Sequence, residues 1–483
     1  MPSVDDYIQT VIQQGDEGSR LLANITAPTL KNNAYVDVVQ SGMNGVAVLR
    51  IPENYAVVVH SASGHPEKTN IKEHTASLIR RLLEQAQNIG ATPIGFADVI
   101  DSRTGDLSLL TDIATTLAVE TTRHNVAILN GENAILGERV TEANVSGTMI
   151  SMIPKKHIFA KDGSYEVLGT PYIRFDPQGQ PVYINSDGVG TKTAFYEILG
   201  NYIEALRDSL AMKWDDTIKL AARVRATSDV LEYNGAITLE EIRALFEPAV
   251  TALAKEFSLP YILNYEHVGK RIQGRGYPSY HISGSVVSTI DEEQLKHPPR
   301  PTPEEQLIAI RGKPNPRSNG ITAKRKALAR CLGEQWYDSA IGETFLEYLA
   351  TPSTIFYPLF KTLLENKEAS SFYHMSGGAY KGKLAKPLAH AGCYVEIENL
   401  FPPDWRELAL AGFNLYSAEQ SFAQWPMGNE GFITTSTPDA ALKRIITHGL
   451  EGKVVGTLEA SDGEDRKGIQ IRAFNGALIT FKG

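Results

Sequence analysis

The sequence is poor in cysteine: among its 483 residues only Cys331 and Cys393 are present, without the close spacing of a metal-binding motif. This scarcity argues against a disulfide-stabilised scaffold and a thiolate metal centre, and it favours two reduced thiols in a cytosolic protein. No run of about 20 apolar residues occurs, so we expect no membrane-spanning helix. Asp5 and Asp6 stand where a signal peptide has basic residues, which predicts a cytoplasmic location.

Positive charge is also scarce, since 47 Lys and Arg face 56 Asp and Glu and the formal net charge is −9. Because binding to a phosphate backbone depends on a basic surface, we expect no nucleic-acid partner. A local basic patch can still bind a phosphorylated small molecule. Hydrophobic residues make up 42% of the chain and charged residues 21%, as in globular proteins. Single cores stop growing at about 250 to 300 residues, so we expect two or three domains.

The GxxxxGK[ST] motif of P-loop proteins is absent, but the stretch PVYINSDGVGTKT at 181–193 has the composition of a phosphate and metal site. Residues 182–185 are typical of a buried strand, and a glycine-rich turn follows them. Its glycines, Gly188 and Gly190, let backbone N–H groups approach an anion, while Lys192 adds positive charge and Asp187 can bind Mg²⁺. The alternative is an ordinary glycine turn after a strand.

Strands and helices alternate along the first two thirds of the chain, which predicts an α/β or α+β layered fold. The order of elements in 55–130 recurs in 181–264. Three blocks of sequence recur in the same order, which predicts a tandem repeat of one domain type, although chance similarity of two βα units is the alternative. The corresponding blocks are ADVI at 97–100 and SDVL at 228–231, ILNGE at 128–132 and ILNYE at 262–266, and VSGT at 145–148 and ISGS at 282–285.

The two predicted copies are not equivalent. The first has Ala62 in the region that corresponds to Asp187, and alanine cannot bind a metal. The first copy keeps Gly131 and Glu132 after a strand, where a carboxylate can bind Mg²⁺ or orient a nucleotide, whereas the second has Tyr265 in place of the glycine. We therefore expect each half to supply part of one site. A polar turn is the alternative for Glu132.

Four prolines within 297–303 predict an extended spacer between domains. The predicted division is therefore a first, degenerate domain at 1–160, a second domain at 161–296, the linker at 297–303, and a C-terminal α/β domain at 304–483.

Three acidic residues on one predicted helix, Asp208, Asp215 and Asp216, are candidate Mg²⁺ ligands. Residues seven apart share a helix face, and Mg²⁺ prefers hard oxygen ligands that it shares with substrate phosphates. A solvated acidic helix face is the alternative.

Two motifs of the last domain are further candidates. Ser318 and Asn319 precede a basic helix, and a helix N-terminus with such residues can bind an anion. His374 ends a predicted strand and is followed by Gly377 and Gly378, which allow close approach to a phosphate or amide, while the imidazole can transfer a proton. A capped turn and a structural histidine are the alternatives.

Together these motifs resemble the aminoimidazole ribonucleotide synthetase (phosphoribosylformylglycinamidine cyclo-ligase) family and its superfamily. The resemblance rests on the DGVGTK sequence at 187–192, NGEN at 130–133, the later Asp and Asp-Asp pair, SNG at 318–320 and HMSGG at 374–378. It covers most of 170–440 and, through the repeat, about 35–155. It implies two N-terminal-type α/β domains that form a β-barrel-like pair within the chain, followed by one C-terminal α/β domain.

The resemblance also implies an ATP- and Mg²⁺-dependent ligase of purine biosynthesis that cyclises formylglycinamidine ribonucleotide. Thr354 and Pro426 replace a family arginine and asparagine, so the acceptor substrate stays open. A different ATP-dependent activator of the superfamily and a non-catalytic nucleotide-binding pseudoenzyme are the alternatives. The expected partner is a phosphorylated purine intermediate, and the chain is expected to be a monomer with an internal pseudo-dimer or a homodimer.

The implied roles fall into three sets. The catalytic residues are His374, Lys192 and Asp187. The nucleotide-binding residues are Asp187, Gly188, Gly190, Thr191, Lys192, Glu132, Asp98, Ser318, Asn319, Gly377 and Gly378. The Mg²⁺ ligands are Asp187, Asp208, Asp215, Asp216 and Glu132.

Overall fold

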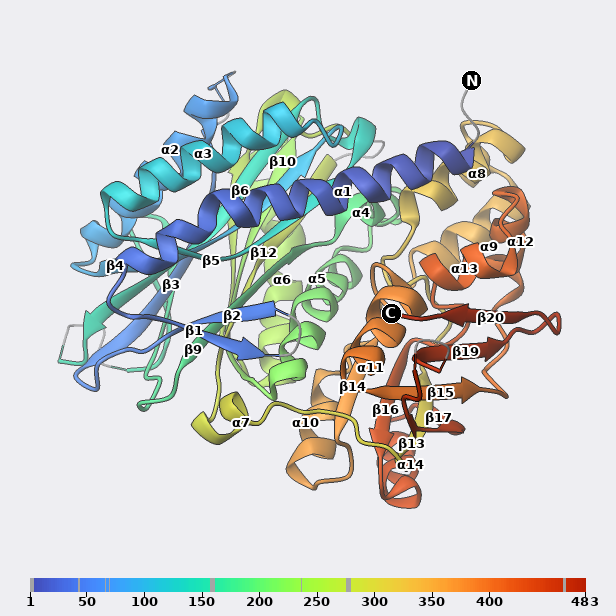
Figure 1. Cartoon of the computed structure of the whole chain (residues 1–483). Coiled ribbons are helices and arrows are strands. Elements are labelled where there is room, and N and C mark those ends of the chain that lie inside the picture. The colour runs from blue at the N-terminus through green and yellow to red at the C-terminus, as the bar shows by residue number, and fades with distance from the viewer. Residues whose placement is uncertain are drawn as a thin grey trace. The chain divides into compact units, whose positions relative to one another are not determined.

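The computed structural model describes residues 4–41, 44–65, 67–68, 70–156, 161–235, 237–274, 279–463 and 466–483 (Figure 1). These residues form a mixed α/β fold, which confirms the predicted class. They divide into a first compact unit of 1–39, 46–213 and 222–292, and a second of 40–45, 214–221 and 293–483. Within the described ranges, no helix has the length and apolar character needed to cross a membrane.

One six-stranded sheet of the first unit is built mainly from the first predicted copy. Its central strands pair in the order β5-β4-β6-β3, with β4 parallel to β5 and antiparallel to β6. In sheet order the strands are β5 (Ala127–Ile135), β4 (Thr92–Ser102), β6 (Ala143–Pro154), β3 (Tyr55–Ser63), β8 (Thr170–Phe175) and β7 (Gly163–Val167).

The other six-stranded sheet repeats this topology with the second predicted copy. Its order β11-β10-β12-β9 corresponds strand for strand to β5-β4-β6-β3, and β10 is again parallel to one neighbour and antiparallel to the other. In sheet order the strands are β11 (Tyr261–His267), β10 (Arg223–Asn234), β12 (Ser279–Thr289), β9 (Val182–Gly188), β2 (Asn44–Leu49) and β1 (Val36–Ser41).

The two sheets share one apolar core. Val57 and Ile150 of the first sheet lie in the same buried cluster as Ile184, Ala226 and Val287 of the second. The predicted barrel-like pairing is therefore a face-to-face packing of two sheets, and within the described residues they stay separate hydrogen-bonded sheets and do not close into a barrel. This packing places strands from both predicted copies next to one another.

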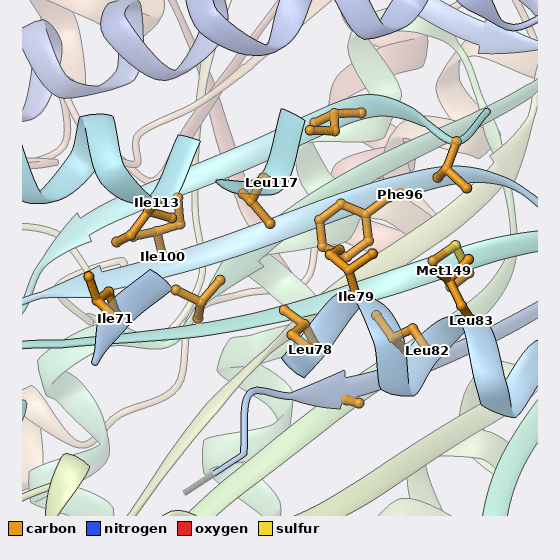
Figure 2. Packing of buried hydrophobic residues seen from close by; sticks show 14 of the residues in the cluster. Ile71, Leu78, Ile79, Leu82, Leu83, Phe96, Ile100, Ile113, Leu117 and Met149 are labelled. Carbon is orange, nitrogen blue, oxygen red and sulfur yellow. The ribbon is translucent and has the colours of Figure 1, made fainter. Parts of the chain in front are cut away.

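The first sheet is covered by α2 (Ile71–Asn88) and α3 (Leu107–Arg123), and α1 (Val4–Thr26) packs on α3. The Asn70 side chain caps α2 by accepting hydrogen bonds from two N–H groups of its first turn. Figure 2 shows Leu78 and Leu82 of α2 packed toward Phe96 and Met149 of the sheet. Because each fully buried side chain of this size contributes about 1.5 to 3 kcal/mol, this face holds the helix on the sheet.

The second copy carries α4 (Thr193–Leu199), α5 (Tyr202–Thr217) and α6 (Leu239–Phe257). A Thr238–Glu241 capping box begins α6. α5 is followed directly by a 3-10 turn at Ile218–Leu220. It ends at Leu220 because Ala221 adopts a left-handed conformation with φ 51°, and β10 then begins.

The second unit contains two four-stranded sheets, in the orders β14-β16-β13-β17 and β18-β15-β19-β20. The strands are β13 (Gln306–Arg311), β14 (Ser371–His374), β15 (Cys393–Ile397), β16 (Gly431–Thr435), β17 (Glu451–Thr457), β18 (Glu459–Ala460), β19 (Gly468–Arg472) and β20 (Leu478–Phe481). The predicted linker at 297–303 forms neither helix nor strand. The predicted boundary at 160/161 lies next to residues 157–160, which are outside the described residues, so the predicted domain division stays a prediction. The helices are α8 (Ile321–Leu332), α9 (Ala340–Leu349), α10 (Tyr357–Glu365), α11 (Lys386–His390), α12 (Trp405–Phe413), α13 (Ala418–Gln424) and α14 (Pro438–Thr447), preceded by α7 (Glu292–Lys296).

Candidate nucleotide and metal site

The glycine-rich stretch forms a strand, a turn and a helix. β9 ends at Gly188, a 3-10 turn spans Gly190–Lys192, and α4 follows directly. Gly190 has φ 66°, a conformation that glycine adopts without strain. The Asp187 carboxylate accepts a hydrogen bond from the N–H of Gly188 at 2.7 Å, so its side chain lies back over the turn. Thr191 is buried within the turn.

Lys192, at the end of this turn, forms a fully buried ion pair. Its ammonium nitrogen lies 2.6 Å from Oδ2 of Asp208, and neither side chain is exposed. The Tyr196 hydroxyl donates a hydrogen bond to the same oxygen. Burial and the adjacent Asp208 carboxylate raise the pKa of Tyr196 well above its usual value. In this structure Lys192 and Tyr196 thus compensate the charge of Asp208.

The end of β5 from the first copy lies beside β9 of the second. The side-chain oxygen of Asn130 accepts a hydrogen bond from the N–H of Ser186 at 3.1 Å. Glu132 follows two residues later on β5 and is partly buried. The structure therefore brings the NGEN segment of one copy to the strand that carries Asp187 of the other.

Asp98 lies on β4 opposite Gly131 of β5. A Cβ atom at position 131 would lie 2.6 Å from Oδ1 of Asp98, so glycine is needed there for the carboxyl group to fit. Burial raises the pKa of Asp98 to about 7.

Asp215 and Asp216 belong to the second unit together with their basic partners. Oδ2 of Asp215 accepts a hydrogen bond from Arg317 at 2.9 Å, and its Oδ1 accepts from the backbone N–H groups of Phe356 and Tyr357. Asp208, Asp215 and Asp216 therefore each have a basic partner in the structure. Their shared role as Mg²⁺ ligands stays a prediction.

His374 is buried between Arg317 and Asp216. Its Nδ1 lies 3.2 Å from a guanidinium nitrogen of Arg317, and its Nε2 lies 2.9 Å from Oδ1 of Asp216. Because arginine can only donate, Nδ1 accepts and Nε2 carries the proton. Burial lowers the pKa of His374 to about 3, so the ring is neutral. Although burial acts to raise the pKa of Asp216, Lys219 and Lys383 hold it well below its usual value.

The loop before α8 has an unusual backbone. Arg317 and Ser318 both have positive φ, at 52° and 50°, and such strained residues cluster at functional sites. The Asn319 amide donates to the backbone oxygen of Ser376 at 2.9 Å, which joins this loop to the glycine-rich turn after β14. In that turn Gly378 has φ 82°, and the space around the Gly377 Cα is open. Ser318, Asn319, Gly377 and Gly378 thus belong to one pair of joined loops.

A cluster of Asp101, Glu232 and His281 in the first unit was not predicted from the sequence. Asp101 and Glu232 each lie one residue beyond the repeated blocks 97–100 and 228–231, and His281 lies one residue before the block 282–285. Extending the comparison of the two copies by one residue would have shown polar residues at corresponding positions.

Known proteins that resemble this chain include phosphoribosylformylglycinamidine cyclo-ligases. The enzyme of Methanococcus vannielii is 24% identical over 300 residues, which are 60% of this chain and 82% of that protein. The enzyme of Thermococcus gammatolerans is 24% identical over 265 residues, or 53% of this chain and 72% of that protein. No family model matches the chain.

Among solved structures, the hydrogenase maturation protein HypE of E. coli aligns with 62% of this chain and 84% of its own, at 14% identity and a TM-score of 0.43. The sequence similarity to phosphoribosylformylglycinamidine cyclo-ligases confirms the resemblance that the motifs predicted.

Proposed function

We propose that this protein is an ATP- and Mg²⁺-dependent cyclo-ligase that converts formylglycinamidine ribonucleotide into aminoimidazole ribonucleotide. The observation that carries the proposal is the hydrogen bond between Asn130 and Ser186, because it sets the two incomplete motifs of the copies side by side. The sequence similarity to cyclo-ligases supports the choice of reaction. We further propose that the two copies arose by duplication and act as an internal pseudo-dimer in the cytoplasm.

In this proposal, Asp187 and Glu132 hold Mg²⁺ against the ATP phosphates. Both are carboxylates, which are the hard oxygen donors that Mg²⁺ prefers, and both are partly buried on neighbouring strands. The N–H groups of the turn at Gly188 and Gly190 bind phosphate oxygens. Lys192 adds positive charge near this turn, while its ion pair with Asp208 fixes its position. Asp98 packs closely against Gly131, the residue before Glu132.

The reaction needs two steps. First, the formyl amide oxygen takes the γ-phosphoryl group from ATP, which converts that oxygen into a leaving group. Second, the internal nitrogen attacks the same carbon, the C–O bond breaks, and phosphate leaves while the nitrogen loses a proton. Positioning and charge neutralisation supply most of the catalysis of phosphoryl transfer. We assign His374 to the second step. Its Nε2–H group donates a hydrogen bond to the activated oxygen in place of Asp216, or its Nδ1, once released from Arg317, takes up the proton that the attacking nitrogen loses.

A second candidate is another ATP-dependent amide- or phosphate-activating enzyme of the same superfamily. Two departures from the cyclo-ligase pattern favour it. Thr354 and Pro426 stand where the cyclo-ligase pattern has an arginine and an asparagine, so the side chains offered to the acceptor substrate differ at both positions.

The test combines ATP binding with product formation. With ATP, Mg²⁺ and formylglycinamidine ribonucleotide, the purified protein is expected to form aminoimidazole ribonucleotide, measured by diazo coupling of the product. Glu132→Gln is expected to weaken ATP binding at least tenfold in calorimetry. The matched control is Glu266→Gln, which changes the corresponding residue of the second copy, where Arg81 and Asn264 contact the carboxylate.

Three other outcomes are informative. Unchanged ATP binding and hydrolysis in Glu132→Gln would refute the composite site. ATP hydrolysis without this product would favour the second candidate, and ATP binding without hydrolysis would favour the non-catalytic nucleotide-binding pseudoenzyme.

A further inference from the structure

Three buried side chains meet between the two sheets of the first unit. Asp101 lies on β4, Glu232 on β10 and His281 on β12, and each is at most 1% exposed. Nδ1 of His281 lies 3.2 Å from Oδ2 of Asp101 and 3.5 Å from Oε2 of Glu232. One ligand atom from each residue lies within 4.8 Å of the other two.

Apart from the two contacts of Nδ1 just described, these buried atoms have no hydrogen-bond partner among the described residues. Oδ2 of Asp101, Oε2 of Glu232 and both ring nitrogens of His281 make no hydrogen bond of good geometry. Buried polar groups without partners are costly, and each such group in a native structure calls for an explanation. When both carboxyl groups are ionised they carry two negative charges, of which a protonated imidazole compensates only one. A divalent cation with a neutral histidine compensates both.

The repeated topology builds the cluster. Asp101 pairs with Asn144 across β4 and β6, and Glu232 pairs with His281 across β10 and β12, so the two pairs occupy corresponding places in the two sheets. Asn144 donates a hydrogen bond at 2.5 Å to Oε1 of Glu232 in the other sheet. This contact orients the carboxylate and leaves its Oε2 directed toward the histidine. Ligands held in this way by a second residue are typical of protein metal sites.

We propose that Asp101, Glu232 and His281 bind a divalent first-row transition metal that links the two sheets. Metal bonds of about 2.0 to 2.2 Å place neighbouring ligand atoms near the separations found here, since cis ligands at that radius lie about 3 to 3.5 Å apart. A mixed imidazole and carboxylate set suits Zn²⁺, Mn²⁺, Fe²⁺ or Co²⁺ better than Mg²⁺. The site uses none of the residues of the proposed ATP site but adjoins it, because the His281 ring lies 3.4 Å from where a Cβ of Gly188 would be and Asp187 interacts electrostatically with Asp101.

The experiment uses Co²⁺ as a spectroscopic probe on the full-length protein after treatment with a chelator. We expect one Co²⁺ per chain, visible absorption bands from the bound ion, and a rise in Tm when Zn²⁺ or Co²⁺ is added. His281→Gln is expected to weaken Co²⁺ binding at least tenfold and to abolish the metal-dependent rise in Tm. Glu232→Gln keeps an oxygen for Asn144 while it removes the charge, and it provides a second test if His281→Gln does not fold.

His60→Gln is the matched control, because His60 is also a fully buried histidine of the first unit but bonds to the backbone oxygen of Leu82. This control should keep the Co²⁺ spectrum and the metal-dependent rise in Tm. A wild-type protein that binds less than about a tenth of an equivalent of Co²⁺, or equal Co²⁺ affinity in wild type and His281→Gln, would overturn the proposal. In either case the cluster would be an ion pair that needs no metal.

Discussion

The ammonium group of Lys192 lies 2.6 Å from Oδ2 of Asp208, and both side chains are completely buried. Removing one partner of such a pair leaves a buried charge without compensation, which costs about 3 to 5 kcal/mol. We therefore expect Lys192→Met to lower the free energy of unfolding by this amount in urea denaturation. The double variant with Asp208→Leu should lose less than the sum of the two single variants.

The matched control for this pair is Lys296→Met. Lys296 and Glu293 form an ion pair whose side chains are 61% and 78% exposed, and water screens the attraction, so Lys296→Met should change the free energy of unfolding little. Equal effects of Lys192→Met and Lys296→Met would contradict the buried pair.

His60 predicts a loss of stability in acid. Burial lowers its pKa from the usual 6.5 to about 4, so below pH 6.5 the unfolded chain takes up a proton that the folded chain does not. The free energy of unfolding therefore falls by up to about 1.4 kcal/mol per pH unit from this residue, between pH 6.5 and 4. His60→Gln should remove that contribution from the difference between the two pH profiles.

Other groups titrate in the same range, so a single pH profile does not isolate His60. The quantity to measure is how steeply the free energy of unfolding changes with pH, from urea denaturation at several pH values, in the wild type and in His60→Gln. His124→Gln, which replaces an exposed histidine, is the matched substitution for this comparison. Parallel profiles for wild type and His60→Gln would show that His60 is not held neutral.

The close packing of Gly131 on Asp98 predicts a steric clash when residue 131 has a side chain, and a smaller residue at position 98 should relieve it. A Cβ atom there would lie 2.6 Å from the Asp98 carboxyl oxygen, so Gly131→Ala is expected to cost about 1 to 3 kcal/mol through overpacking. Asp98→Ala in the same chain removes the clash and should recover part of that loss. Chemical denaturation of the wild type, the two single variants and the double variant measures the coupling free energy between positions 98 and 131.

Gly412→Ala is the control for this pair, because it lies in α12 with open space around its Cα. This substitution should be neutral or slightly stabilising, since alanine has the higher helix propensity. An additive loss in the Gly131→Ala, Asp98→Ala double variant would contradict the proposed contact.

The contacts of Arg317 lead us to expect that lysine cannot replace it. Its guanidinium group bonds to Asp215, to Nδ1 of His374 and to the backbone oxygen of Thr354, and a lysine lacks the planar fork that reaches all three. We expect Arg317→Lys to cost about 2 to 3 kcal/mol, as for the loss of one or two charged hydrogen bonds. Histidine ¹⁵N NMR should also show a changed tautomer for His374.

Arg311→Lys is the matched control, because Arg311 pairs with the exposed carboxylate of Glu451. That variant should change stability by less than about 1 kcal/mol and leave the His374 signal unaltered. An unchanged His374 spectrum in Arg317→Lys would refute the assigned hydrogen bond.

Local features of this fold follow from the sequence. The capping residue Thr238 and the apolar spacing after it specify α6, and short runs of β-branched and aromatic residues specify strands such as β15 and β16. These signals depend only on residues that are close together in the sequence. The recurrence of the blocks around Asp98 and Asp229 likewise anticipated two sheets of one topology. The resemblance to cyclo-ligases was visible in short motifs along the chain, from NGEN at 130–133 and DGVGTK at 187–192 to HMSGG at 374–378.

Partnerships between distant residues were decided by tertiary structure. Asp208 and Asp216 share one helix and one residue type, yet Lys192 compensates one and His374 contacts the other, because each helix turn meets a different part of the chain. Asp101, Glu232 and His281 are up to 180 residues apart and meet only because two sheets pack face to face. Sequence periodicity determines which face of an element is buried, whereas packing determines which charges then have to share that space.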